Sequence, residues 1–138
     1  MLRYLADSTA VWRLQHDRTL GAAWGYETDE GSIGSCHPQR VEFRRSARNL
    51  DEYDAMTDMF ADLYPDAPVP KGAWQWIEAA QYRLAQRGRH QSLSTVDWLI
   101  CATAAHHGLV VLHDDKDFAV AAGLLTDLHE HNVHRTPG

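Results

Sequence analysis

The chain has few cysteines and lacks any long apolar run. Its two cysteines, Cys36 and Cys101, lie far apart and have no Cys-x-x-Cys spacing. They are typical of buried reduced thiols rather than of a disulfide framework, so we expect a cytoplasmic protein. No apolar run approaches the length of a membrane span, and the first residues lack the pattern of a signal peptide. We therefore expect no membrane partner.

The chain also lacks an excess of basic residues. Its formal net charge is −6, which argues against a protein that coats nucleic acid non-specifically, because such binding needs a basic surface. An enzyme that acts on nucleic acid is still compatible with this charge when its own acidic residues lie in a metal site. Bound divalent cations would reverse the local field there.

Repeats, low-complexity tracts and linkers are absent from the 138 residues, which suffice for one domain with its own core. We expect a single domain over residues 1–131 and a loose tail over residues 132–138. Short apolar runs predict strands at residues 2–7, 32–36, 109–113 and 125–129. Amphipathic spacing, prolines and glycines predict helices at residues 9–14, 19–30, 37–48, 51–63, 72–87, 94–107 and 117–122. This alternation predicts a three-layer α/β/α sandwich with a mainly parallel sheet, and the helix-rich middle predicts a helical layer or arm built onto the sheet.

Two acidic residues follow directly on predicted strands. Asp7 ends the first strand, and Asp115 comes soon after the apolar run 109–112. Ligands of an open parallel sheet bind just beyond the carboxyl ends of its strands, so the two carboxylates predict one shared pocket. Clustered carboxylates repel one another and are costly to bury, and a hard cation such as Mg²⁺ is the simplest reason for such a cluster.

Asp7 and Asp97 each have a structural alternative to metal binding. Asp7 is either a metal ligand supported by the Thr9 hydroxyl or the N-cap of the helix that follows. Asp97 comes three residues after Ser94, which is the spacing of a capping box. The two roles coexist when a carboxylate in the first turn projects past the helix end toward a metal.

Glu42 stands between the apolar residues Val41 and Phe43, so part of its predicted helix faces the core. The alternative is a solvated glutamate on a helix surface. Arg45 follows one turn later on nearly the same side, and it is the arginine best placed to reach a substrate phosphate if Glu42 is a ligand. The other nearby arginines share a stripe that points away from Glu42, namely Arg40, Arg44 and Arg48.

The acidic segment after the run 109–112 carries the strongest signal. Phe118 is predicted to anchor the chain back into the core after three acidic residues, and a solvated turn is the alternative. We predict Asp115 as the main ligand, Asp117 as a secondary ligand, directly or through water, and Asp114 as pointing outward. A histidine tract near the C-terminus lacks the cysteine or acid that would complete a soft-metal site, and we interpret it as tail surface or an incidental metal contact: His129, His131 and His134.

In chain order, these residues resemble the PIN-domain ribonucleases, and within them the VapC-type toxins of bacterial toxin–antitoxin modules. The resemblance runs from Tyr4 to Gly123. The family's opening Asp-x-Ser/Thr motif matches Asp7 and Thr9, and its mid-chain glutamate matches Glu42. Its helix-starting aspartate matches Asp97, and its closing Asp-x-Asp-Phe motif matches residues 115–118. The chain departs from the pattern in having Ser8 beside Thr9, and His113 where relatives often have threonine.

The resemblance implies a PIN-like fold and cleavage of RNA, with transfer or ribosomal RNA as the expected target. It also implies one or two Mg²⁺ ions, with Mn²⁺ as a substitute, which activate a water for attack on the phosphodiester. The implied ligands and supporting hydroxyls are Asp7, Glu42, Asp97, Asp115, Asp117, Ser8 and Thr9. A cognate antitoxin and a homodimer are the implied protein partners. By position alone, the candidates for RNA contact are Arg45, Arg89 and Lys116.

Two other functions compete with this one. A phosphoacceptor signalling domain also places acids at strand ends, but it expects an acidic pair after the first strand and an aspartate near mid-chain, where this chain has Glu42. A non-catalytic module that keeps the fold for protein contacts is the other alternative. The presence of all four acids argues against it.

Overall fold

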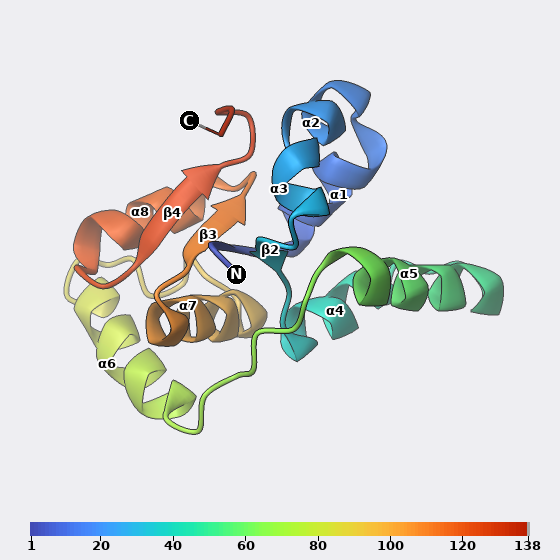
Figure 1. Ribbon diagram of the computed structural model, residues 1–138. Helices are drawn as coiled ribbons and strands as arrows, with labels where there is room; N and C mark the ends of the chain where they lie inside the picture. Colours follow the sequence, from blue (N-terminus) through green and yellow to red (C-terminus); the bar gives the residue numbers. More distant parts are fainter. Residues whose placement is uncertain (138) are drawn as a thin grey trace.

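Four short parallel strands form the centre of the computed structural model, which describes residues 1–137 (Figure 1). Their order across the sheet is β2-β1-β3-β4, and every neighbouring pair is parallel, as predicted. The strands are β1 (Tyr4–Ala6), β2 (Ile33–Gly34), β3 (Val110–His113) and β4 (His129–Asn132). Ala6 is paired with Leu112, so β1 and β3 end at the same edge of the sheet.

Helices cover both faces of this sheet and build two separate cores. The helices are α1 (Ser8–His16), α2 (Arg18–Ala23), α3 (Gly25–Asp29), α4 (His37–Arg44), α5 (Leu50–Leu63), α6 (Ala73–Ala85), α7 (Thr95–His107) and α8 (Lys116–Leu124). Successive residues of a strand face opposite sides of the sheet. Leu5 accordingly joins the core formed with α6, α7 and α8, whereas Tyr4 and Ala6 join the core formed with α1 and α2. The predicted three-layer α/β fold is confirmed.

The helix-rich middle forms both an arm and part of a layer. The arm consists of α4 and α5, and α5 extends away from the sheet (Figure 1). Helices α6 and α7 instead pack over the sheet, where their apolar faces are buried. The predicted helix 37–48 ends earlier, at Arg44. None of the helices in residues 1–137 is long and apolar enough to cross a membrane.

The predicted continuous helix 19–30 is wrong, because the helix is interrupted at Trp24, between α2 and α3. The indole of Trp24 is fully buried, meets the Tyr4 ring edge-on at 5.3 Å between ring centroids, and donates from Nε1 to the carbonyl oxygen of Val133 at 2.8 Å. In a straight helix over residues 19–30, the Trp24 side chain would have a different direction from the one it has here. Tertiary packing therefore decides the local structure here.

The predicted last strand, 125–129, is also wrong, because β4 begins only at His129. Leu125 and Leu128 are buried in the core beneath a turn, and the polar sequence His-Glu-His-Asn forms the strand at the sheet edge. Val133 follows directly, is buried, and donates its backbone N–H to the carbonyl of His113 at 2.7 Å. The loose tail expected from residue 132 therefore does not begin there.

Arg40 has a structural role that its place in the arginine stripe did not suggest. Its side chain is nearly buried and donates to the Ser35 hydroxyl at 2.7 Å and to the Asp66 carboxylate at 2.7 Å. These bonds tie α4 to the segment that follows α5. The other two members of the stripe are also engaged: Arg44 stacks on the Tyr53 ring, and Arg48 pairs with Glu52.

We expect Arg40→Ala to lower the free energy of unfolding by about 1–3 kcal/mol, because it removes the donor to the buried Ser35 hydroxyl and a packed side chain, whereas the exposed Asp66 carboxylate can be solvated by water. Urea denaturation followed by circular dichroism measures this change. Arg45→Ala is the matched control, because Arg45 is exposed and its loss should change stability by less than about 0.5 kcal/mol. Equal urea midpoints for the two variants would refute the structural role of Arg40.

Candidate metal centre

Asp7 lies at the end of β1 and begins α1. Its backbone N–H donates to the carbonyl of Leu112 at 3.0 Å, which holds it against the end of β3. Its carboxylate caps α1 by accepting the Ala10 N–H at 2.8 Å, and the Thr9 hydroxyl lies 2.7 and 2.8 Å from its two oxygens. The side chain is only 3% exposed. Asp7 is thus an N-cap, but helix capping alone does not require a carboxylate to be buried.

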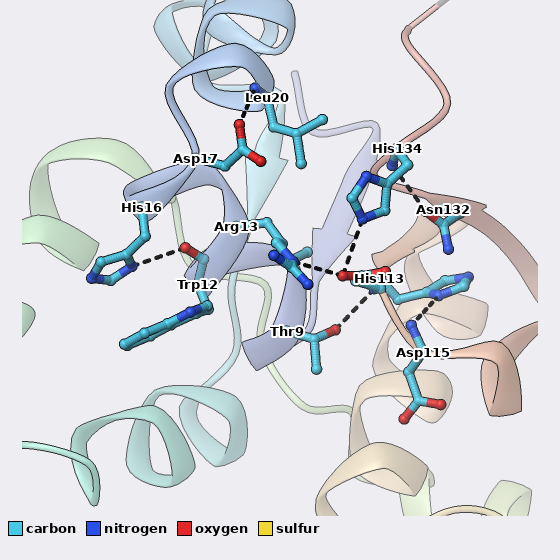
Figure 2. Close-up of polar contacts among 12 residues, drawn as sticks. Thr9, Trp12, Arg13, His16, Asp17, Leu20, His113, Asp115, Asn132 and His134 are labelled. Carbon is cyan, nitrogen blue, oxygen red and sulfur yellow. Dashed lines mark hydrogen bonds and ion pairs between the residues drawn. The ribbon is translucent and has the colours of Figure 1, made fainter.

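Asp115 ends the turn after β3 and caps α8, where its Oδ1 accepts the Asp117 N–H at 2.9 Å. The Asp115 N–H donates to Nδ1 of His113 at 3.0 Å (Figure 2). Nε2 of His113 lies 2.7 Å from the carboxylate of Glu130 on β4. Because Nδ1 accepts, Nε2 carries the proton that is donated to Glu130. The imidazole is almost fully buried. It therefore connects β4 to the backbone that holds the Asp115 carboxylate.

Asp97 occupies the first turn of α7. Its N–H donates to the Ser94 hydroxyl at 3.1 Å, and its Oδ2 accepts the Ser94 N–H at 3.2 Å, which completes the predicted capping box. Burial raises the pKa of Asp97 above its ordinary value, and the negative charges of Glu42 and Asp115 raise it further. The helix cap and the neighbouring negative charges therefore coexist at this helix end.

Glu42 projects from α4 toward the start of α1. The Ser8 hydroxyl donates to Glu42 Oε1 at 2.8 Å, and the amide nitrogen of Gln39 lies 3.3 Å from the same hydroxyl oxygen. Gln39 is fully buried, and its donation leaves the single Ser8 proton for Glu42. The two neighbouring hydroxyls thus have separate partners: Ser8 holds Glu42, whereas Thr9 holds Asp7.

The four main acids share one electrostatic environment. Burial raises the pKa of Asp7 to about 7, and the charges of Asp97 and Asp115 contribute to that rise. The charges of Glu42 and Asp115 act in the same direction on Asp97. The four carboxylates come from the end of β1, from α4, from the start of α7 and from the loop after β3. Their charges therefore act on one another near the carboxyl edge of the sheet, and we call these four residues the acidic cluster.

Asp114 and Asp117 differ in their surroundings. Asp114 is not the outward-pointing residue that we predicted, because its carboxylate pairs with Arg13 at 2.8 Å and with His134 at 3.2 Å (Figure 2). Its backbone N–H donates to the Thr9 hydroxyl at 2.9 Å, so the loop is fastened to α1. Asp117 is half-buried in the first turn of α8, and its role as a secondary ligand stays a prediction.

The chemistry of these donors fits a hydrated hard cation. Within residues 1–137, no group of three or more histidine, cysteine or acidic side chains is placed so that together they could hold a metal ion. Mg²⁺ does not need such a group, because it commonly binds through one or two carboxylates and keeps several waters for contact with substrate phosphate. A buried carboxylate among like charges is the feature that a cation would relieve. Asp7 is that carboxylate.

The histidine tract does not gather into a soft-metal site. His131 packs edge-on against the Trp24 ring at 5.4 Å between centroids, and its Nε2 lies 2.9 Å from the carbonyl of Arg135. His134 instead turns to Asp114, and His129 is exposed. These residues serve packing and hydrogen bonding.

The three cations predicted to contact RNA are exposed and lie next to elements that carry the acids. Arg45 caps the C-terminus of α4, and Lys116 is the first residue of α8. Arg89 lies in the loop before α7 and its N–H donates to the carbonyl of Leu84 at 2.8 Å. Their part in RNA binding stays a prediction.

A groove adjoins the acidic cluster between α1 and α4. It encloses about 460 Å³ and is lined by Ser8, Thr9, Trp12, Glu42, Phe43 and Ser46, among others. It continues past Trp12, Phe43 and Ser46 into a second groove of about 650 Å³ between α1 and α5, whose apolar lining includes Met56 and Met59. We call them the small groove and the large groove.

Comparison with known proteins supplies an independent finding. The PIN domain family model matches residues 7–124. Ribonuclease VapC6 of Mycobacterium tuberculosis is 58% identical over 117 residues, which cover 83% of this chain and 92% of that protein. Ribonuclease VapC2 of the same species is 49% identical over 137 residues, which cover 98% of this chain and 96% of that protein.

Solved structures agree on the fold. The crystal structure of VapBC2 from Rickettsia felis, bound to a DNA fragment from its promoter, superposes with a TM-score of 0.76 at 12% identity. The match covers 95% of this chain and 98% of that chain. The structure of DNA-bound VapBC from Salmonella typhimurium gives the same TM-score at 14% identity, covering 96% and 99% of the two chains.

Proposed function

The chain belongs to the PIN domain family, and from this premise we propose that it is a metal-dependent endoribonuclease, the toxin of a VapC-type toxin–antitoxin module. Its homology to two ribonucleases of this type supports the RNA substrate. The observation that supports the proposal is the buried Asp7 carboxylate at the edge where β1 and β3 end, whose pKa is raised in part by the charges of Asp97 and Asp115, while the charges of Glu42 and Asp115 raise that of Asp97.

Asp7, Asp97 and Asp115 would hold a hydrated Mg²⁺ or Mn²⁺, one or two of them directly and the rest through its waters, with Glu42 completing the acidic cluster and Asp117 assisting. A bound divalent cation supplies Lewis acidity at the scissile phosphate and lowers the pKa of a water. The chain's own contribution is positioning: Thr9 orients Asp7, Ser8 orients Glu42, and the His113–Glu130 pair holds the backbone of Asp115. None of these side chains acts as a nucleophile.

RNA would approach the acidic cluster along the exposed cations Arg45, Arg89 and Lys116. Single-stranded loops of transfer or ribosomal RNA are the expected targets, because their unpaired backbone reaches a recessed site more readily than a duplex does. Arg45 is the strongest of the three candidates, because it follows Glu42 by one turn and is free of the salt bridges that engage Arg40 and Arg48 within residues 1–137.

We expect a cognate antitoxin to cover the acidic cleft and a second copy of the chain to complete a homodimer. Solved relatives of the same fold carry the names of toxin–antitoxin complexes. The large groove has the apolar, methionine-containing lining that suits the apolar face of a partner helix. Size-exclusion chromatography with light scattering would report the homodimer.

Removal of metal tests the proposed reaction directly. The purified chain should cleave RNA in Mg²⁺ or Mn²⁺, lose this activity in excess EDTA, and regain it when the metal is restored, because the carboxylates alone cannot activate water. Mapping of RNA 5′ ends after induction in cells identifies the cut site. Cleavage that persists in EDTA refutes the metal-dependent mechanism. Mn²⁺ binding without cleavage of any RNA would instead favour a non-catalytic interaction module.

A further inference from the structure

Trp12 presents an ordered aromatic surface beside the acidic cluster. It lies on α1, five residues after Asp7, and is 49% exposed. The His16 ring stacks on it with 3.8 Å between ring centroids and 24° between planes (Figure 2). His16 is itself fixed, because its Nδ1 lies 2.9 Å from the carbonyl oxygen of Trp12. The Trp12 ring therefore has one face covered by the His16 ring, which the contact with the Trp12 carbonyl orients.

The small groove connects Trp12 to the proposed reaction centre. It is lined by Trp12 together with Ser8, Thr9 and Glu42, and these three are the residues that hold or belong to the acidic cluster. A nucleotide next to a phosphate bound at the cluster would therefore extend into this groove. Phe43, from α4, also lines this groove.

The lining of the small groove suits a neutral flat group better than a phosphate. Its one cationic side chain, Arg13, is already paired with Asp114, and Glu42 adds negative charge. Aromatic surfaces with nearby hydroxyls match a nucleobase, which has an apolar face and a polar edge. Proteins that read single-stranded RNA commonly stack unpaired bases on such side chains.

We propose that Trp12, backed by His16, is a stacking platform for the nucleobase adjacent to the scissile phosphate, and that the small groove contributes to the choice of cut site. This inference rests on the proposed ribonuclease function. In this proposal the small groove binds RNA, whereas the large groove binds a helix of a protein partner.

The test compares Trp12→Ala, Trp12→Phe and a control, Trp74→Ala. Trp74 is also exposed but lies on α6, outside both grooves. Cleavage of a fluorescent pool of short random-sequence RNA in Mn²⁺ gives kcat and KM, and thermal unfolding checks the fold. Trp12→Ala should raise KM about tenfold, because stacking of one base is worth roughly that factor or more. Trp12→Phe should retain most of the affinity, and Trp74→Ala should match the wild-type protein.

An abasic substitution makes the test specific for a base. Removing the base next to the cut site should weaken the wild-type reaction by the same factor as Trp12→Ala, and combining both changes should add little, because they remove one interaction. If the effects of Trp12→Ala and of base removal are fully additive at every position near the cut site, the proposal that Trp12 stacks on a base is overturned. Unchanged RNA kinetics in Trp12→Ala, with loss of binding to an antitoxin-derived helix, also overturns it and gives this surface to the protein partner.

Binding without cleavage separates this inference from the proposed function. The pool's affinity is measured in an Asp115→Asn background, with and without Trp12→Ala. A wild-type chain that never cleaves RNA, but whose Asp115→Asn form binds RNA through Trp12, refutes the ribonuclease and keeps the platform. A chain that neither cleaves nor binds RNA refutes both.

Discussion

Asp7→Asn is expected to abolish most RNA cleavage while making the metal-free protein more stable. Loss of the carboxylate should lower kcat by about 100- to 1,000-fold, the range found when one main electrostatic contact of a reaction centre is removed. Asparagine retains an oxygen that can accept the Ala10 N–H, so the cap of α1 survives. The buried charge disappears, and with it the cost of ionising a group whose pKa is raised to about 7.

The stability gain has a defined pH dependence. The unfolded chain ionises Asp7 near pH 4, whereas the folded metal-free chain keeps it protonated up to about pH 7. Folded wild-type protein therefore binds more protons in this window and loses stability as the pH rises through it. The advantage of Asp7→Asn should appear above about pH 4, grow to about pH 7 and then level off at about 2–4 kcal/mol.

Urea unfolding in EDTA across this pH range measures the gain in stability, and a fluorescent RNA assay in Mn²⁺ measures the loss of cleavage activity. Asp58→Asn is the matched control, because Asp58 is an exposed acid on α5 away from the acidic cluster. Asp58→Asn should change neither the stability of the protein nor its cleavage of RNA. An Asp7→Asn variant that is less stable than the wild-type protein at every pH would show that the Asp7 carboxylate is a structural group only.

The position of the acidic cluster could be predicted because it depends on local rules. Asp7 and Asp115 each follow a short apolar run, and parallel strands bring such positions to one edge. Asp97 could be placed because a capping box marks the start of a helix. Glu42 needed the family resemblance, since a single glutamate on a helix carries no signal of its own.

The supporting contacts could not be predicted because they join residues that are distant in sequence. Glu130 reaches His113 from β4, and β4 itself escaped prediction because an edge strand of polar residues lacks the apolar pattern of a buried one. Gln39 reaches Ser8 from a different helix. The one available signal was His113 itself, a histidine at the end of an otherwise apolar strand that requires a buried partner.

Cation binding should weaken steeply below pH 7. As a ligand, Asp7 would bind Mn²⁺ in its ionised form, and its raised pKa of about 7 means that a proton would have to be displaced at lower pH. The apparent dissociation constant should therefore increase by about tenfold for each pH unit below 7, with the release of about one proton per ion. Calorimetric titration in two buffers of different ionisation enthalpy measures both quantities.

Thr9→Val sharpens this prediction. The Thr9 hydroxyl donates to the Asp7 carboxylate and lowers its pKa, so removing it should move the binding profile to higher pH. Thr19→Val, at an exposed position on α2, should leave the profile in place. Mn²⁺ affinity that stays constant between pH 5 and pH 8 would exclude Asp7 as a ligand. In that case the cation would bind through Asp97 and Asp115, and the burial of Asp7 would serve only the junction of β1 and α1.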